Sequence, residues 1–301
     1  MKNRKLLLIL VIVIGAALLI GPMLNRKGGK TITVGAKDFT EQYVLGSMIS
    51  VLLSENGFNV TEQFGTGSTI TREGLETAQT DLYAEYTGTA WAVYLNRADE
   101  VISDPELLYD MVKAEDAANG IVWLAPAPMN NTFALAVRAD DVAAYGDSLT
   151  SLAAYNNAHP GEIIFGISHE FYERADGFWA MADAYGMKVE ESQVRNMDAG
   201  LSFEAIDRGQ IDVAMVFATD GKLPKFNLKV LTDPQNFFPI YNMAVCVRQE
   251  ILDQYPEIEE ILAPLSEFDD ESMQLLNYKV DAEEIPAEKV ARDYLEAEGL
   301  I

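Results

Sequence analysis

Apolar and polar positions alternate with two different periods along most of the chain. From Thr31 onward, short runs with the two-residue period of a strand are followed by longer runs with the 3.6-residue period of a helix. The first part of the chain predicts strands at 31–34, 58–64 and 83–86 and helices at 40–54, 69–79, 90–96 and 105–118. Thr40 is the expected cap of the first helix. This order indicates an α/β sheet with short connections, in which ligands bind beyond the carboxyl ends of the strands.

A second α/β unit follows in the pattern. It contains strands predicted at 131–137, 162–167, 212–217 and 228–231 and helices predicted at 171–185 and 203–208. An extended run at 237–248 then leads into an acidic, helical tail at 249–301. We interpret 31–137 as the first part of lobe I, 138–236 as lobe II, and 237–301 as the return to lobe I with the C-terminal helices. A chain organised in this way forms a cleft between its lobes, which is a preferred place for a small ligand.

The first 30 residues differ from the rest of the chain. Lys2, Arg4 and Lys5 precede an uncharged run at 6–24, and a second basic segment follows at 25–30. A run of this length approaches the roughly 20 residues that span a bilayer and exceeds most signal-peptide cores. We therefore favour an uncleaved membrane anchor over a removed signal peptide, and no cysteine lies nearby for lipid attachment. The domain is expected on the extracytoplasmic face of the membrane, anchored by residues 6–24, or secreted if the segment is cleaved.

Charge and cysteine content narrow the function further. The 301 residues include 47 acidic and 22 basic side chains, a net charge of −25. This charge argues against a nucleic-acid partner, because the phosphate backbone has to be met by Lys and Arg. The single cysteine, Cys246, lies in an apolar run, so it forms no intramolecular disulfide and is expected in the core.

Motifs of catalysis and cofactor binding are incomplete. His169 and Glu170 begin like the zinc motif H-E-x-x-H, but Glu173 stands where the second histidine belongs. The segment 166–170 lacks the final glycine of G-x-S-x-G, and no phosphate-binding glycine loop is present. The sequence therefore predicts no catalytic residue, metal site or cofactor.

The segment 81–89, with the sequence DLYAEYTGT, places two tyrosines directly before a helix start. Aromatic faces attract cations, and a helix N-terminus attracts anions, so one loop could contact both ends of a small zwitterion. The alternative is a purely structural strand-to-helix turn, in which Tyr83 and Tyr86 only pack.

Six motifs in chain order carry a family resemblance. They are GAKDFTEQ at 35–42, DLYAEYTGT at 81–89, NNTFAL at 130–135, EFYERADG at 170–177, ATDG at 218–221 and FFPIY at 237–241. From about Thr31 to the C-terminus the chain resembles the substrate-binding proteins of osmoprotectant ABC importers, which bind glycine betaine, choline, carnitine or proline betaine. The resemblance implies an α/β, two-lobed type II periplasmic-binding-protein (Venus flytrap) fold. It also implies a monomer that delivers a quaternary-ammonium ligand to an ABC permease and, through it, to ATPase subunits.

The resemblance also implies site residues. An aromatic box for the quaternary ammonium would consist of Tyr86, Phe133, Phe217 and Tyr241, where the two phenylalanines replace the usual tyrosines. Candidates for the opposite, carboxylate end are Lys37, Thr89 and Arg174, with Glu170 as a lobe-closing or ammonium-side carboxylate and Asn131 and Gln42 as further hydrogen-bonding groups.

Alternatives remain open for several of these positions. Arg174 and Glu170 are four residues apart, which also suits a surface ion pair, and spacing alone would place Phe133 and Phe217 in the core. Two other functions compete. One is a binding protein or sensor for an amino acid or other small anion, in which Arg174 and Lys37 dominate. The other is a hydrolase that uses Glu170 and His169.

Overall fold

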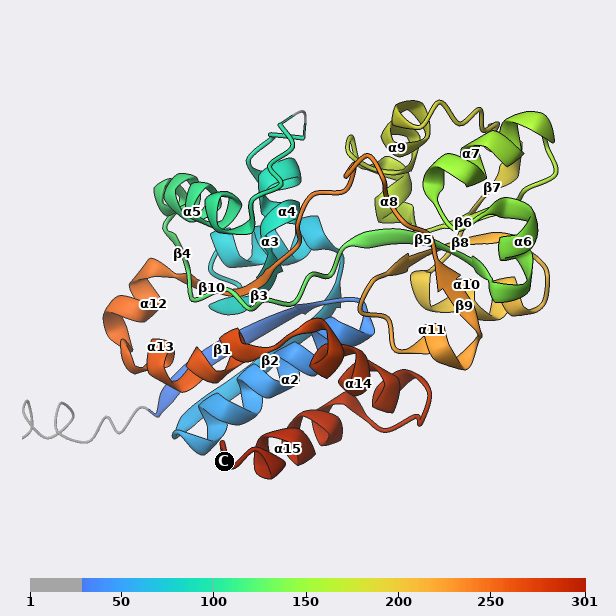
Figure 1. Ribbon diagram of the computed structural model, residues 1–301. Coiled ribbons are helices and arrows are strands. Elements are labelled where there is room, and N and C mark those ends of the chain that lie inside the picture. The colour runs from blue at the N-terminus through green and yellow to red at the C-terminus, as the bar shows by residue number, and fades with distance from the viewer. Residues whose placement is uncertain (1–28, 99) are drawn as a thin grey trace, which may run out of the picture.

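The computed structural model describes residues 29–98 and 100–301, which form two halves, each built around a five-stranded mixed sheet (Figure 1). The expected anchor at 6–24 lies outside the described residues. Over the part of the chain that is described, no helix is both long and apolar enough to cross a membrane.

The first sheet has the strand order β2-β1-β3-β10-β4. Its strands are β1 (Lys30–Lys37), β2 (Phe58–Thr66), β3 (Leu82–Tyr86), β4 (Ile121–Trp123) and β10 (Met243–Arg248). β1 pairs in parallel with β2 and β3, whereas β10 runs antiparallel to β3 and β4. The last strand of the protein therefore lies within the first sheet. This is expected for a chain that forms a second lobe and then returns to the first.

The second sheet has the order β7-β6-β8-β5-β9. Its strands are β5 (Phe133–Arg138), β6 (Phe165–Ile167), β7 (Val194–Asn196), β8 (Val213–Phe217) and β9 (Leu228–Val230). β5 pairs antiparallel with β8 and β9 and thus belongs to this sheet, although the sequence analysis assigned residues up to 137 to lobe I. The boundary between the sheets falls between β4 and β5, because the partners of β5 come only later in the sequence.

Helices flank both sheets. In the first half they are α2 (Thr40–Glu55), α3 (Ser68–Glu76), α4 (Thr87–Thr89), the π-helix η1 (Ala90–Tyr94), α5 (Pro105–Asp116) and η2 (Ala117–Asn119). The second half has η3 (Ala139–Asp141), α6 (Val142–Tyr145), α7 (Leu149–Ala158), α8 (His169–Glu173), α9 (Phe178–Ala184), η4 (Glu191–Gln193), α10 (Ala199–Asp207) and α11 (Lys222–Lys225). The tail forms α12 (Gln249–Gln254), α13 (Glu257–Leu262), η5 (Ala263–Glu267), α14 (Asp270–Asp281) and α15 (Ala287–Ala297).

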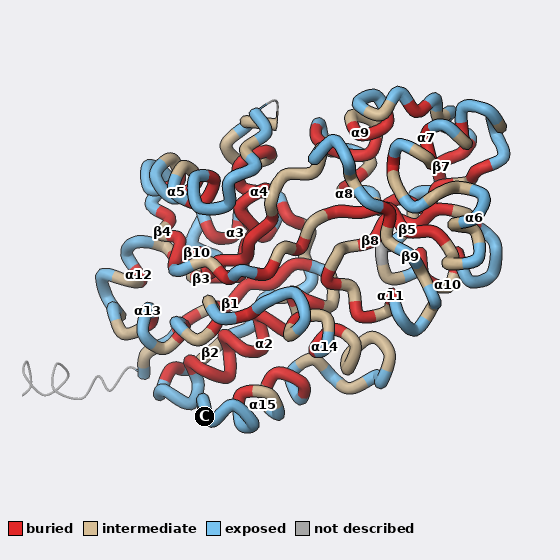
Figure 2. The backbone as a smooth tube through the Cα atoms, in the orientation of Figure 1, coloured by how far each residue is buried: buried red, intermediate tan, exposed pale blue. Residues whose placement is uncertain are grey.

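Burial follows the two sheets. The strands are mostly buried and the outer faces of the flanking helices are exposed (Figure 2). α15 and α14 pack beside α2, so the acidic tail covers the first half (Figure 1). Cys246 is fully buried in β10, as its apolar neighbours predict.

Two crossover segments join the halves, 124–132 going out and 231–242 coming back, and they meet in an antiparallel bridge between Asn130 and Asn242. The carboxyl ends of β1, β6 and β8 meet between the halves, where Asp38, Ser168 and Phe217 lie. The carboxyl ends of parallel strands are where α/β sheets bind ligands, so this topology puts a site between the lobes.

Several predicted elements differ in detail. The expected helix at 171–185 is broken, because Arg174 leaves the helical conformation at the end of α8 and α9 begins only at Phe178. The extended run at 237–248 is a regular strand only from Met243, since its first part is a crossover. Thr40 does not cap α2; its hydroxyl donates to Asp281 at 2.7 Å.

The break between α8 and α9 depends on Gly177. A Cβ atom there would lie 2.1 Å from the carbonyl oxygen of Phe171 and 3.0 Å from that of Arg174. We predict that Gly177→Ala destabilises the protein by about 1–3 kcal/mol, because backbone has to move to admit the methyl group. Urea unfolding measures this.

Gly67→Ala is the matched control for that substitution. Gly67 has an ordinary extended conformation, and no atom lies within 4 Å of the position that an added methyl group would take. We therefore expect a change in the free energy of unfolding below about 1 kcal/mol. Equal effects of the two substitutions would contradict the role assigned to Gly177.

Candidate functional site

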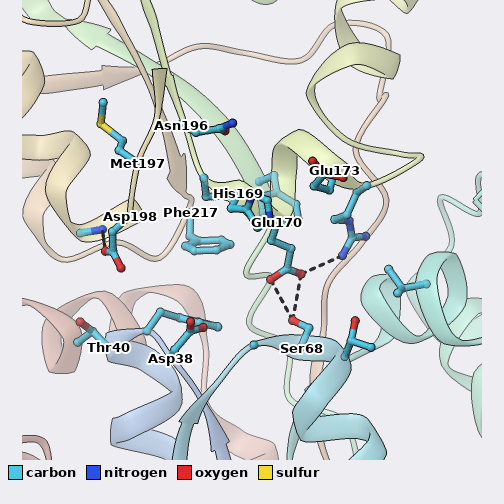
Figure 3. Close-up of a pocket in the computed structure, with 18 of the residues that line it drawn as sticks. Asp38, Thr40, Ser68, His169, Glu170, Glu173, Asn196, Met197, Asp198 and Phe217 are labelled. Atoms are coloured by element: carbon cyan, nitrogen blue, oxygen red, sulfur yellow. Dashed lines mark hydrogen bonds and ion pairs between the residues drawn. The ribbon is translucent and has the colours of Figure 1, made fainter. Parts of the chain in front are cut away.

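A cleft of about 1030 Å³ lies between the two halves. Asp38, Thr40 and Ser68 of the first half face Glu170 and Asp198 of the second half across it (Figure 3). This volume is at the upper end of the range that holds a drug-sized ligand. A small ligand would therefore be enclosed only if the lobes moved closer together.

Five aromatic rings gather at the inner end of the cleft. Phe39 stacks on Phe217 at 5.1 Å and on Tyr86 at 6.2 Å between ring centroids. Phe133 contacts Phe217 at 5.2 Å and Tyr241 edge to face at 5.5 Å. We call these five residues the aromatic cluster. It unites five separate segments of the chain, and its faces can attract a cation.

Cations of the protein itself lie over three of these rings. The ammonium of Lys37 is 5.1 Å from the centroid of Tyr86. The guanidinium of Arg174 is 5.3 Å from the centroid of Phe133 and 5.9 Å from that of Tyr241. Because Tyr86 and Tyr241 are each only 2% exposed, a ligand would meet Phe39 and Phe217 first.

Glu170 connects the halves across the cleft. Its two carboxylate oxygens accept the hydroxyl of Ser68 at 3.0 and 3.1 Å, and one of them is 3.4 Å from Arg174 (Figure 3). The expected ion pair of Glu170 with Arg174 is thus present, but the arginine side chain is 5% exposed and does not lie on the surface.

Glu41 is a buried carboxylate where the halves meet. It accepts hydrogen bonds from Tyr86 and Asn131 at 2.8 Å each, from Thr219 at 2.6 Å and from Asn277 at 3.1 Å. These donors come from β3, the first crossover, the turn after β8 and α14. Burial raises the pKa of Glu41 against the lowering effect of the four hydrogen bonds. Glu41 was not among the predicted site residues, although it lies within the motif at 35–42.

The ten predicted site residues fall into two groups. Phe133, Glu170, Arg174 and Phe217 line the cleft. The remaining six are buried behind its described lining: Lys37, Gln42, Tyr86, Thr89, Asn131 and Tyr241. Their ligand roles stay predictions.

Gln42 and Asn131 form hydrogen bonds around Tyr86 and Glu41, next to the aromatic cluster. Gln42 donates to the carbonyl of Ala84 at 2.9 Å and to the hydroxyl of Tyr86 at 3.1 Å. Asn131 is buried and donates its side-chain amide to the hydroxyl of Thr219 at 2.8 Å as well as to Glu41. Both residues therefore position the cluster in this structure.

The turn at 81–89 touches the second crossover directly. A Cβ atom on Gly88 would lie 2.8 Å from the ring of Tyr241 and from the carbonyl oxygen of Ile240, so only glycine permits this approach. Tyr83 is fully buried and donates to Glu85 at 2.6 Å, which agrees with a packing role.

Two further aromatic residues near the site were missed. Phe39 lies inside the motif at 35–42, where an aromatic ring next to the assigned Lys37 was the available signal. Phe171 is fully buried and stacks on Phe133 at 4.8 Å, outside the residues that line the cleft. It was counted only as part of a helix.

The comparison with protein families identifies the chain. Residues 30–297 match the substrate-binding domain of ABC-type glycine betaine transport systems, and the chain belongs to this family. The family resemblance and the type II periplasmic-binding-protein fold expected from the sequence are thereby confirmed. Members of the family bind small ligands outside the cytoplasmic membrane and deliver them to a permease, and they are not enzymes.

Relatives agree with this assignment. The glycine-betaine-binding protein of Pseudomonas aeruginosa is 38% identical, over 90% of this chain and 89% of its own length. The glycine betaine-binding protein YehZ of Escherichia coli is 33% identical over 92% and 93%, and its apo structure has a TM-score of 0.66 over 90% of this chain and 99% of that one. The ergothioneine transport permease and binding protein EgtU of Helicobacter pylori is 32% identical over 98% of this chain but 52% of its own.

Asp220 provides a pH-dependent feature of the cleft wall. It lies in the turn after β8 and accepts the amide of Phe217 at 2.7 Å, and burial raises its pKa to about 7 from an ordinary 3.8. A carboxyl group whose pKa is higher in the folded chain stabilises the fold at low pH. That contribution is lost as the pH rises through about 7.

We therefore predict that Asp220→Asn becomes more stable relative to the wild type as the pH rises from 5 to 9, by about 1–4 kcal/mol. Urea unfolding at a series of pH values measures the difference. Asp183→Asn, which removes an exposed carboxylate on α9, should run parallel to the wild type. If the free energy of unfolding of Asp220→Asn differed from that of the wild type by the same amount at every pH, Asp220 would not titrate in this way.

Proposed function

We propose that this protein captures a quaternary-ammonium osmoprotectant, such as glycine betaine, choline or carnitine, in the aromatic cluster between its lobes. The observation that carries the proposal is the convergence of Phe39, Phe133 and Phe217 at the inner end of a cleft in a member of this family. A trimethylammonium group donates no N–H hydrogen bond, so aromatic faces are the groups best suited to its charge.

Lobe closure is the proposed binding step. In the described state the cleft is wider than an osmolyte requires, and Phe217 is only half buried. Closure would bring more ring surface onto the ligand and remove water, which strengthens each cation–π contact from about 0.5 to about 2 kcal/mol. The contact of Glu170 with Ser68 is already a bond between the lobes and is the proposed closing contact.

Isothermal titration with glycine betaine, choline, carnitine and ergothioneine tests the function. We expect micromolar or tighter binding of at least one of them, and no heat from any would overturn the proposal.

The expected loss of affinity for Phe217→Leu is about tenfold, because leucine fills space but has no aromatic face.

Phe58→Leu is the control for that substitution. Phe58 is 4% exposed at the start of β2 and contacts Tyr255, outside the residues that line the cleft. It should leave the affinity unchanged. The aromatic cluster would not bind the ligand if affinity were unaltered in Phe217→Leu and also in Tyr86→Ala and Tyr241→Ala variants that still fold.

We further propose that the protein is a monomer held at the outer face of the cytoplasmic membrane by residues 6–24, from where it delivers its ligand to a permease with ATPase subunits. The support is the length of the uncharged run and its basic flanks. The assignment of the chain to its family does not depend on the anchor.

Cell fractionation tests the anchor. We expect the full chain in the membrane fraction, resistant to extraction by high salt and released by detergent. Arg substitutions at Leu10 and Ile14 should release it, because each charge costs about 2.5–3.5 kcal/mol at the centre of a helix in a bilayer. Recovery of a shortened wild-type chain in the soluble fraction would indicate cleavage instead.

A further inference from the structure

We infer that the cleft selects a quaternary ammonium ligand whose other end carries no negative charge, such as choline, over one that ends in a carboxylate, such as glycine betaine. The inference rests on the proposed function and narrows its ligand class. It follows from the ion pairs of Lys37 and Arg174, the two cations that were expected to bind a ligand carboxylate.

Lys37 is already neutralised. Its ammonium lies 2.5 Å from a carboxylate oxygen of Glu85, and the two side chains are 2% and 0% exposed. The same carboxylate accepts the hydroxyls of Tyr83 at 2.6 Å and Tyr94 at 2.9 Å. Detaching Lys37 would leave a buried, unpaired carboxylate, which costs several kcal/mol. A ligand carboxylate would have to offset that cost to recruit this lysine.

Arg174 is neutralised as well. Its Nε and Nη2 donate to the two oxygens of Asp176 at 2.8 and 2.6 Å, a bidentate pair whose side chains are 5% and 8% exposed. Nη1 is 3.4 Å from Glu170. Two carboxylates thus surround one guanidinium, and the local charge at this end of the cleft is negative.

The rest of the described cleft wall adds more negative charge. Apart from Arg174, its only Lys or Arg is Lys222, whose ammonium is 3.4 Å from the carbonyl of Gly200. The carboxylates that line it in addition to Glu170 and Asp176 are Asp38, Glu173, Asp198, Asp220 and Asp281. Even with Asp220 counted as neutral, acids outnumber bases.

This charge balance acts in opposite directions on the two kinds of ligand. A trimethylammonium group is attracted by the carboxylates and by the aromatic cluster. A ligand carboxylate is repelled by the excess of carboxylates, and among the described lining residues only Lys222 offers it a cation without a carboxylate partner within ion-pair distance. An alcohol group avoids both costs, because its O–H can donate to a carboxylate such as Glu170.

Titration calorimetry with choline, glycine betaine and glycine betaine methyl ester tests this directly. The ester keeps the betaine skeleton and removes the negative charge, with one added methyl group as the only other change. We expect choline and the ester to bind at least about tenfold tighter than glycine betaine. Glycine betaine binding as tightly as both would overturn the inference and leave the proposed function intact. No binding of any of the three would overturn the inference, and it would overturn the proposed function as well only if carnitine and ergothioneine also failed to bind.

A pair of charge-neutralising variants tests the cause. Asp176→Asn frees one side of Arg174, so we expect the preference for choline over glycine betaine to shrink about tenfold. Asp183→Asn removes one negative charge from the same half at an exposed position on α9 and should keep the wild-type ratio. A purely structural effect of Asp176→Asn would weaken both ligands equally, and an unchanged ratio in a folded variant would contradict the assigned role of the pair. If that variant does not fold, the three-ligand series with the wild type decides.

Discussion

The carboxylate of Glu41 is the interaction on which the arrangement of the two halves depends most. Among the residues that the structure describes it has no cationic partner, and it is 2% exposed, so it is stable only while four donors from four separate segments surround it. Those segments are β3, the outgoing crossover, the turn after β8 and α14. A buried carboxyl group with such requirements connects the two halves near the crossovers.

The aromatic cluster is tied to the same network. Tyr86 donates its hydroxyl to Glu41, and burial beside that carboxylate raises the pKa of Tyr86, so the hydroxyl stays protonated. Through Glu41 the Tyr86 ring is therefore connected to Thr219 of the second half, which donates to the same carboxylate. Lys37 and Arg174 lie over rings of this cluster and are each bound by a carboxylate, so a ligand cation meets an environment built to hold positive charge.

Much of the fold could be predicted from the sequence because its signals are local. The strands β1, β2, β3, β5 and β8 and the helix α2 follow the two hydrophobic periods closely. The short strands β4 and β7 were missed because three residues are too few to show a hydrophobic period. The helix α7 was missed because its cap is a serine among other polar residues. The lobe to which β5 belongs could not be predicted either, because it depends on pairing with β8, which lies far along the chain.

By itself the sequence determined the class of protein: an α/β chain with six ordered motifs, too acidic for nucleic acid and without a complete catalytic motif. Of the ten site residues predicted from the sequence, four line the cleft: Phe133, Glu170, Arg174 and Phe217. Only the tertiary structure decided how they are used. Ring contacts, the pairing of Lys37 with Glu85 and of Arg174 with Asp176, and the place of Glu41 between four segments depend on distances across the fold, which residue types and spacing along the chain do not encode.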